Sequence, residues 1–468
     1  MFKKKSDESN YNQEPGLSYF RSQVGSSEHV FRQSQVQRIH NHLLRQHDVK
    51  RRALSKYNFK GKSFTPASIV LQGCKSVITF HTAYLVGNPV TITGTPKAVE
   101  LINKHYRKGI YSKTDWDILK ELVTYGNAFE YVYLDEYGRI KSKVFRNKDA
   151  YPIYDHDNNY CYFVEYWKTK QGTDEHFTIY YPTHVDSYVN GRLVESKDNF
   201  TGLPIHYIAM DRSEYDQFGD SMMLDLIPIQ DKIEGLLSKL DDAITTLSLN
   251  PIGVINGARI QETDMIDSNI AGAVLNLEEG GSFKYSSATM DYSCIKYELD
   301  QLYQQYNLVA CIPSSILGQN NIANVSENSM SMVYQLTENK GKENVNSLVE
   351  GFNQRFEKMR ILMNLINDPI SDEDYDSLNV TFNISKPIDT KQNMENMKTQ
   401  YDMGAISKRT IMEQSPYTTD SAQELQRLAD EGKAITEQND EVMEEENTDS
   451  ITDEGSETLE NTGVEADE

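Results

Sequence analysis

Residues 317–366 constrain the fold of this chain more than any other stretch. The polar loop LGQNNIANV (residues 317–325) leads directly into a helical pattern that runs from Ser326 to Ile366. At about 1.5 Å of rise per residue, a single helix of this length would span about 60 Å, more than the width of a small domain. One arrangement that would require such a helix is a radial spoke in a ring of subunits, with a loop at its inner end.

The helical pattern is strongest in its second half, where apolar residues share one helical face: Val345, Leu348, Val349, Phe352, Phe356, Met359, Leu362, Met363 and Ile366. Its weak point is Gly341, which lies between two lysines. Because glycine inside a helix costs about 1 kcal/mol relative to alanine, we expect a kink at Gly341. Two separate helices in an ordinary bundle are the alternative.

The composition bounds the class of protein. Hydrophobic residues make up 38% of the chain, which is below the usual globular share, and no apolar run is long enough to predict a membrane span. The basic first residues are followed by polar ones, so a signal peptide is not expected. Four scattered cysteines form no CxxC pair, which argues against a zinc site or a disulfide framework and favours a reducing cytoplasm.

The net charge of −23 is concentrated at the C-terminus. Residues 430–468 hold 16 acidic residues, one lysine and no aromatic residue, a composition that predicts a disordered tail. The rest of the chain still has an excess of negative charge. Proteins that hold DNA tightly neutralise its phosphates with lysine and arginine, so any DNA partner must slide past this protein.

The chain between residues 31 and 223 has the pattern of an α+β domain, after a polar segment at residues 1–30 that we expect to be flexible. Helices are predicted over 33–56, 68–86 and 116–124. A hairpin follows over 129–145, and further strands continue to Met210. Asn190-Gly191 predicts a two-residue hairpin turn.

Two helices enclose a small β segment in the middle of the chain. The first, over 224–249, has a narrow apolar face that includes Ile233, Leu237, Leu240 and Ile244, with charged residues mostly elsewhere. Glycines mark turns in the β segment over 252–285, and a returning helix follows over 291–308. A late strand over 379–385 and short helices over 391–427 complete the pattern.

Motifs for catalysis are absent from the sequence. There is no P-loop, no GxGxxG after a strand, no GxSxG and no HExxH. The spacing of His40, His42 and His47 does not put all three on one helical face, so we expect a solvated helix surface rather than a metal site. No catalytic, metal or cofactor site is predicted. A nuclease that uses His40, His42 and nearby carboxylates is the enzyme alternative.

The order of these elements resembles the portal proteins of tailed bacteriophages, in particular the family of the siphophage SPP1 portal. The resemblance is carried by AYLVGNPV at Ala83–Val90, YGNAFEYVYLDEYGRIK at Tyr125–Lys141, the helix with its flanks at Asp225–Pro251, and the run from Ile312 to Ser329. These segments occur in the family's order across most of residues 35–390.

The resemblance implies a portal fold divided into a wing (31–223), two stem helices (224–250 and 291–311) and a small β clip (251–290). It further implies a tunnel loop (312–327), a long kinked helix with a wing strand (328–390) and a helical crown (391–429). The flexible N-terminus (1–30) and the disordered acidic tail (430–468) lie outside it. Another ring-forming tail or baseplate connector is the alternative.

The resemblance also implies the partners. Such a protein forms a homo-oligomeric ring, usually of twelve subunits, at one capsid vertex of a virion assembled in the host cytoplasm. It contacts the major capsid and scaffolding proteins, binds the large terminase during packaging, and then binds the head–tail adaptor. Double-stranded DNA passes through it non-specifically during packaging and ejection. No cofactor and no membrane are implied.

The tunnel loop would present Gln319, Asn320, Asn321 and Asn324 to the duplex. Amides can hydrogen-bond to phosphates without a fixed charge, so their contacts are weak and independent of base sequence. Together with acidic walls, such a loop makes a conduit with low friction.

We predict that changing Asn320 and Asn321 together to lysine hinders DNA packaging and leaves ring assembly intact, because fixed positive charges hold the phosphates. Packaged DNA per particle measures the effect, and electron microscopy of the rings is the control. Normal filling by the double variant would exclude these residues from the tunnel loop.

Overall fold

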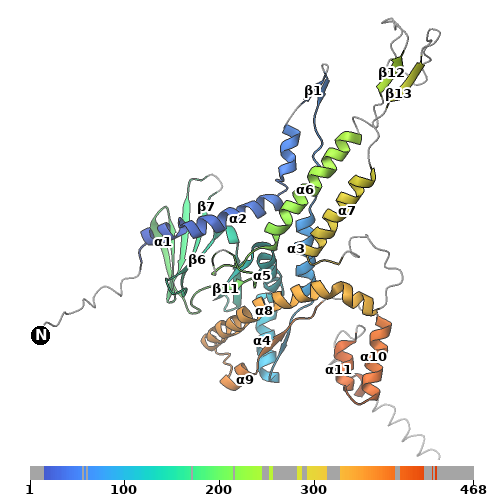
Figure 1. The fold of residues 1–468 in the computed structure, drawn as a ribbon. Coiled ribbons are helices and arrows are strands. Elements are labelled where there is room, and N and C mark those ends of the chain that lie inside the picture. Colours follow the sequence, from blue (N-terminus) through green and yellow to red (C-terminus); the bar gives the residue numbers. More distant parts are fainter. Residues whose placement is uncertain are drawn as a thin grey trace, which may run out of the picture. The chain divides into compact units, whose positions relative to one another are not determined.

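The computed structural model describes residues 15–54, 57–59, 62–169, 172–213, 217–244, 252–256, 282–286, 292–313, 327–384 and 390–415, together with residues 215, 424 and 427–429. The chain divides into two units, residues 1–385 and 386–468. The first unit combines helices with antiparallel sheets (Figure 1). Every named strand pair is antiparallel, so the expected α+β class is confirmed at this level.

The N-terminal region is helical from residue 17, so the prediction of a flexible segment is wrong for residues 17–30. Its elements are α1 (Leu17–Val24), α2 (Ser27–Leu43) and the 3-10 helix η1 (Asp48–Leu54). Phe20 is fully buried among aromatic residues of the large sheet. The predicted single helix over 33–56 is also wrong, because α2 ends at Leu43 and Arg45 turns the chain with a φ of 63°.

Two sheets form the central part of the first unit. The larger has the order β10-β9-β8-β7-β6 and the smaller β11-β4-β5. Their strands are β4 (Asn127–Leu134), β5 (Ile140–Phe145), β6 (Ala150–Tyr154), β7 (Tyr160–Lys168), β8 (Glu175–Tyr180), β9 (His184–Val189), β10 (Arg192–Asp198) and β11 (Ile205–Ile208), with the 3-10 helix η2 (Asn147–Asp149) before β6. The predicted hairpin β4–β5 and the Asn190-Gly191 turn between β9 and β10 are confirmed.

Helices α3 (Gly73–Val86), α4 (Pro96–Gly109) and α5 (Tyr111–Tyr125) pack beside the smaller sheet. No helix is predicted over α4 from the sequence, although Pro96 at its first turn is a helix-start signal. The predicted helix start at residue 68 is wrong, since residues 65–72 are not helical and α3 begins at Gly73. The pairs β1 (Tyr57–Phe59) with β2 (Lys62–Phe64) and β3 (Thr91–Thr93) with β14 (Asn379–Thr381) are short.

Two helices, α6 (Met222–Ala243) and α7 (Tyr292–Val309), pack side by side (Figure 1). The antiparallel pair β12 (Ile252–Asn256) and β13 (Ser282–Ser286) lies between them in sequence, in the predicted β segment. The rest of that segment is outside the described residues. None of the described helices is long and apolar enough to cross a membrane.

The long pattern near the C-terminus forms one helix, α8 (Glu327–Leu365), of 39 residues. The alternative of two separate helices is therefore wrong. Gly341 lies inside this helix, and the predicted kink there stays a prediction. The short helix α9 (Asp372–Asp376) follows before β14.

The main hydrophobic core joins α3–α6, α8 and the smaller sheet. It contains the predicted apolar face of α8, including Leu348, Phe352, Phe356, Met359, Leu362 and Met363, all of which are buried. Burial of each such side chain contributes about 1.5–3 kcal/mol. The fold is thus built around the second half of α8.

The second unit contains α10 (Thr390–Asp402) and α11 (Lys408–Gln414), which fall within the predicted short helices. Ser407 caps α11 by accepting a hydrogen bond from the Thr410 N–H. The predicted disordered tail, residues 430–468, lies outside the described residues.

We predict that Gly351→Ala destabilises the protein by about 1–3 kcal/mol, the usual cost of overpacking a core. A Cβ at Gly351 of α8 would lie 2.0 Å from Cε1 of the buried Tyr207. The control is Gly235→Ala in α6, where a Cβ meets nothing within 4 Å and helix propensity favours alanine by about 1 kcal/mol. Thermal unfolding measures both, and equal shifts would contradict the close approach.

Candidate functional site in the long helices

The predicted DNA-facing residues Gln319, Asn320, Asn321 and Asn324 lie outside the described residues. The structure does describe both ends of the segment that carries them. The chain leaves α7 at Val309, is described to Pro313, and re-enters the described part with α8 at Glu327. The candidate site is therefore the set of contacts that holds these two ends.

The end of α7 is fixed by hydrogen bonds to α3 and α8. His81 of α3 donates from Nε2 to the Ala310 carbonyl at 2.7 Å, and Thr337 of α8 donates from Oγ1 to the Cys311 carbonyl at 2.6 Å. Burial lowers the pKa of His81 to about 4, so its imidazole is neutral at pH 7. The start of the undescribed segment is thus attached to both neighbouring helices.

The long helix is anchored by Arg355, which is fully buried. Its Nη1 donates to Asp115 Oδ1 at 2.5 Å, and its Nε donates to Glu130 Oε2 at 3.0 Å. Two tyrosines complete the shell, since Tyr106 accepts from Nη1 at 2.9 Å and Tyr207 donates to Glu130 at 2.5 Å. One side chain of α8 thereby joins α4, α5, β4 and β11.

Two carboxylates share the single charge of Arg355. Burial raises the pKa of Asp115 to about 6, although Arg355 opposes the shift. A buried charge that loses its partner is costly, so this arrangement resists any sliding of α8 along the sheet. This group of residues is not predicted from the sequence. Its signal is an arginine within the apolar stripe of α8 and a glutamate on the inward face of β4.

Helix α6 is held by a row of polar side chains four residues apart, here called the polar ladder: Gln230, Glu234, Ser238 and Asp242. They accept hydrogen bonds from backbone N–H groups of Cys74, Leu71, Ile69 and Ala67, at 2.9, 2.9, 2.9 and 2.7 Å respectively. The first three ladder residues are buried. The expectation that the charged residues of this helix lie mostly away from its packed face is wrong for Glu234.

The spacing of the polar ladder follows from backbone geometry. Four residues of an α-helix advance about 6 Å, and two residues of an extended chain advance about 6.6 Å. The spacing of the N–H groups at residues 67, 69 and 71 along the extended chain is therefore close to the spacing of successive ladder side chains along α6. The ladder also reaches α7, because the Tyr306 hydroxyl donates to Gln230 at 3.2 Å.

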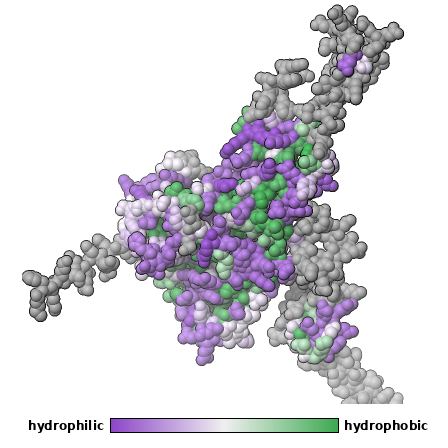
Figure 2. Space-filling view, viewed as in Figure 1, coloured by the Kyte–Doolittle hydropathy of each residue, from purple (hydrophilic) through white to green (hydrophobic). Residues whose placement is uncertain are grey.

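The four predicted packing residues of α6 differ in burial. Ile233 is buried in the core, Leu237 packs against it, and Leu240 is half-buried. Ile244, which caps the C-terminal end of α6, is 41% exposed. Figure 2 shows apolar side chains gathered over α6 and α7 on the face in view. The packing role of Ile244 stays a prediction.

Gly341 has a packing role that the sequence did not reveal. A Cβ there would lie 3.2 Å from Cε1 of Tyr84 on α3, which is tighter than ordinary van der Waals contact. The missing side chain lets Tyr84 pack against α8, beside Tyr334 with ring centroids 6.5 Å apart.

The expected solvated histidine surface is wrong for two of its three residues. His42 and His47 are buried, and their rings stack with centroids 3.7 Å apart. The predicted helix over 33–56 would separate these residues, whereas the turn at Arg45 brings His47 back onto the end of α2. Asp231 of α6 completes a group whose donor atoms lie within 4.8 Å of one another.

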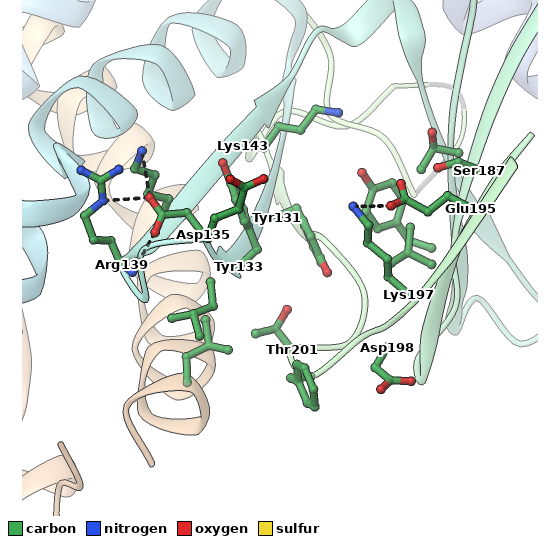
Figure 3. A pocket seen from close by; sticks show the side chains of 18 of the residues that line it. Tyr131, Tyr133, Asp135, Arg139, Lys143, Ser187, Glu195, Lys197, Asp198 and Thr201 are labelled. Atoms are coloured by element: carbon green, nitrogen blue, oxygen red, sulfur yellow. Dashed lines mark hydrogen bonds and ion pairs between the residues drawn. The ribbon is translucent and has the colours of Figure 1, made fainter. Parts of the chain in front are cut away.

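A cavity of about 770 Å³ lies between the β4–β5 hairpin and strands β8–β10 (Figure 3). Several of its charged residues are paired with one another, including Asp135 with Arg139 at 2.8 Å and Glu195 with Lys197 at 2.9 Å. Tyr131 and Tyr133 of β4 also line the cavity. This is a mixed-charge surface, and its residues do not form an acid–base pair or an activated nucleophile.

Comparison with known proteins identifies the family. Residues 28–438 match the family described as "Phage portal protein, SPP1 Gp6-like". Solved structures that are similar include the neck of an empty GTA particle computed with C6 symmetry (12% identity, TM-score 0.46), over 72% of this chain and 87% of that one. The virion of a native gene transfer agent particle gives 13% identity and a TM-score of 0.43, over 72% and 88% of the two chains.

The neck of the native GTA particle computed with C12 symmetry gives the same identity and TM-score, over 74% and 90%. No curated protein sequence matches the chain. Because the family match covers most of its length, the chain belongs to the phage portal protein family. Proteins of this family form oligomeric rings in the phage particle and are conduits for its DNA. They are structural and not enzymes, so the nuclease alternative is dropped.

We predict that Arg355→Met destabilises the protein by about 3–5 kcal/mol, because it leaves Asp115 and Glu130 buried without their partner. The matched control is Arg360→Met, five residues further along α8, which breaks a pair with the exposed Asp372. That loss should cost about 1 kcal/mol or less. Chemical denaturation measures both variants, and similar costs would show that Arg355 does not anchor the helix.

Proposed function

We propose that this portal protein forms a ring of twelve subunits at one capsid vertex, with α6 and α7 as its stem. The observation that carries the proposal is the exposure of this helix pair. Of the 18 residues of α7, only Tyr306 and Asn307 are buried in the single chain. Tyr297 and Leu308 are exposed together with Ile244, the C-cap of α6. Neighbouring copies would cover these side chains.

The remaining parts follow the same assignment. Residues 251–290, which include β12 and β13, form the clip that binds the large terminase and later the head–tail adaptor. Residues 31–223 and the second half of α8 form the wing, where capsid and scaffolding proteins bind. Residues 391–429 form the crown. Assembly takes place in the host cytoplasm.

The long helix acts as a rigid support for the tunnel loop at 312–327. Arg355 fixes the outer half of α8 to the wing, and Thr337 ties its inner half to the end of α7. The loop amides at Gln319, Asn320, Asn321 and Asn324 touch the DNA weakly as it passes. The chain's net charge of −23 favours sliding over tight binding.

We predict that Ile244→Asn reduces the fraction of protein in rings, because each subunit contact loses the burial of an isoleucine, worth about 1.5–3 kcal/mol. Lys239→Gln, at an exposed polar position of the same helix, should assemble normally. Electron microscopy of the purified protein gives the ring fraction, and end-on views give the symmetry. A wild-type protein that stays monomeric under assembly conditions would refute the proposed function.

A further inference from the structure

The end of α2 and the middle of α6 bring together two histidines and an aspartate. His42 lies in the last turn of α2, and the left-handed residue Arg45 reverses the chain. His47 then stacks on His42, and Asp231 approaches from α6, with Oδ1 3.7 Å from His42 Nε2. The three side chains come from two elements that are far apart in sequence.

Two polar atoms of this group are buried without a hydrogen-bond partner. They are Nε2 of His42 and Oδ1 of Asp231. Such atoms are uncommon in folded proteins, and an unseen ion is one of their standard explanations. A protonated His42 would offer Asp231 only a long ion pair and would place its charge against the His47 ring. A metal ion between the two atoms would satisfy both.

The third ligand is already oriented. His47 Nδ1 lies 2.8 Å from Oε1 of Glu234, a carboxylate that is completely buried. When Nδ1–H donates to this carboxylate, Nε2 is the nitrogen left for a metal, the arrangement common in carboxylate–histidine–metal sites. His47 Nε2 also lies 2.9 Å from the His42 carbonyl oxygen and 3.3 Å from Nε2 of Gln72, and metal binding would replace both contacts.

We propose that His42, His47 and Asp231 bind one Zn²⁺ ion. Two imidazoles and a carboxylate are ligands that suit zinc. Tetrahedral bonds of about 2.1 Å put ligand atoms about 3.4 Å apart. The donor atoms lie within 4.8 Å of one another, so the farthest must move together by about 1.4 Å and the stacked histidine rings must tilt apart. A cavity of about 420 Å³ borders all three residues and supplies water as the fourth ligand.

The surrounding charges are compatible with a cation. Asp231 and Glu234 provide two negative charges at the site. Arg38 and Arg51 line the cavity but are exposed to solvent, and Arg51 pairs with Asp48 at 3.3 Å. The ion fastens the end of α2 to α6, the helix that also carries the polar ladder.

The test uses the full-length protein, stripped of metal by a chelator and incubated with Zn²⁺ in excess Mg²⁺, which occupies exposed carboxylates. We expect one Zn²⁺ per chain after desalting and a higher unfolding temperature with Zn²⁺ than without. Co²⁺ should give the visible absorption of a tetrahedral site. His42→Gln and Asp231→Asn should each abolish the stoichiometric Zn²⁺ and the unfolding shift.

The matched control is His40→Gln, two residues before His42 on α2. This variant should keep both the stoichiometric Zn²⁺ and the rise in unfolding temperature. His42 Nε2 and Asp231 Oδ1, the atoms that the His42 and Asp231 variants change, have no hydrogen-bond partner in the protein. The circular dichroism spectra of the metal-free variants should therefore match that of the wild type. Absence of bound Zn²⁺ in the wild type, or its retention in the His42 and Asp231 variants, would overturn the site. Ring formation by metal-free protein is scored separately, so failure here leaves the portal assignment untouched.

Discussion

The buried guanidinium of Arg355 is the contact on which the rest of the first unit depends. It lies where a helix of 39 residues crosses the smaller sheet, and its hydrogen bonds reach two carboxylates and a tyrosine from other elements. Apolar packing alone would let a long helix slide in steps of one turn, because its surface repeats. A charged group with fixed partners has one favourable position, so Arg355 sets the register of α8 against the sheet.

A second polar contact sets the register of α6. The polar ladder replaces a neighbouring strand for residues 67–71, whose N–H groups would otherwise be unpaired. Hydrogen bonds from α7 and α8 then fix the chain at residues 310 and 311. The three long helices are thus positioned by directional contacts as well as by burial. These contacts hold the described ends of α7 and α8 on either side of residues 314–326.

Much of the architecture could be predicted from sequence because it rests on periodicity. The apolar face of α8, the β4–β5 hairpin and the Asn190-Gly191 turn are local patterns, and the structure contains them. Errors arose where a local pattern was extended too far. The helix predicted to Lys56 ends at Leu43, and this single difference changes His42 and His47 from surface residues to a buried pair. Glu130, Glu234 and Arg355 were assigned no role, since charge in a sequence usually indicates a solvated face.

The sequence by itself determined the family, much of the order of helices and strands, the length of α8 and the acidic balance of the chain, because these depend on residue type and spacing along the backbone. The tertiary structure alone decided which polar residues are buried and with whom they pair. Asp115, Glu130 and Arg355 are separated by as many as 240 residues, and nothing in the local pattern couples them. Their meeting follows from how α5, β4 and α8 pack, and packing is a property of the whole chain.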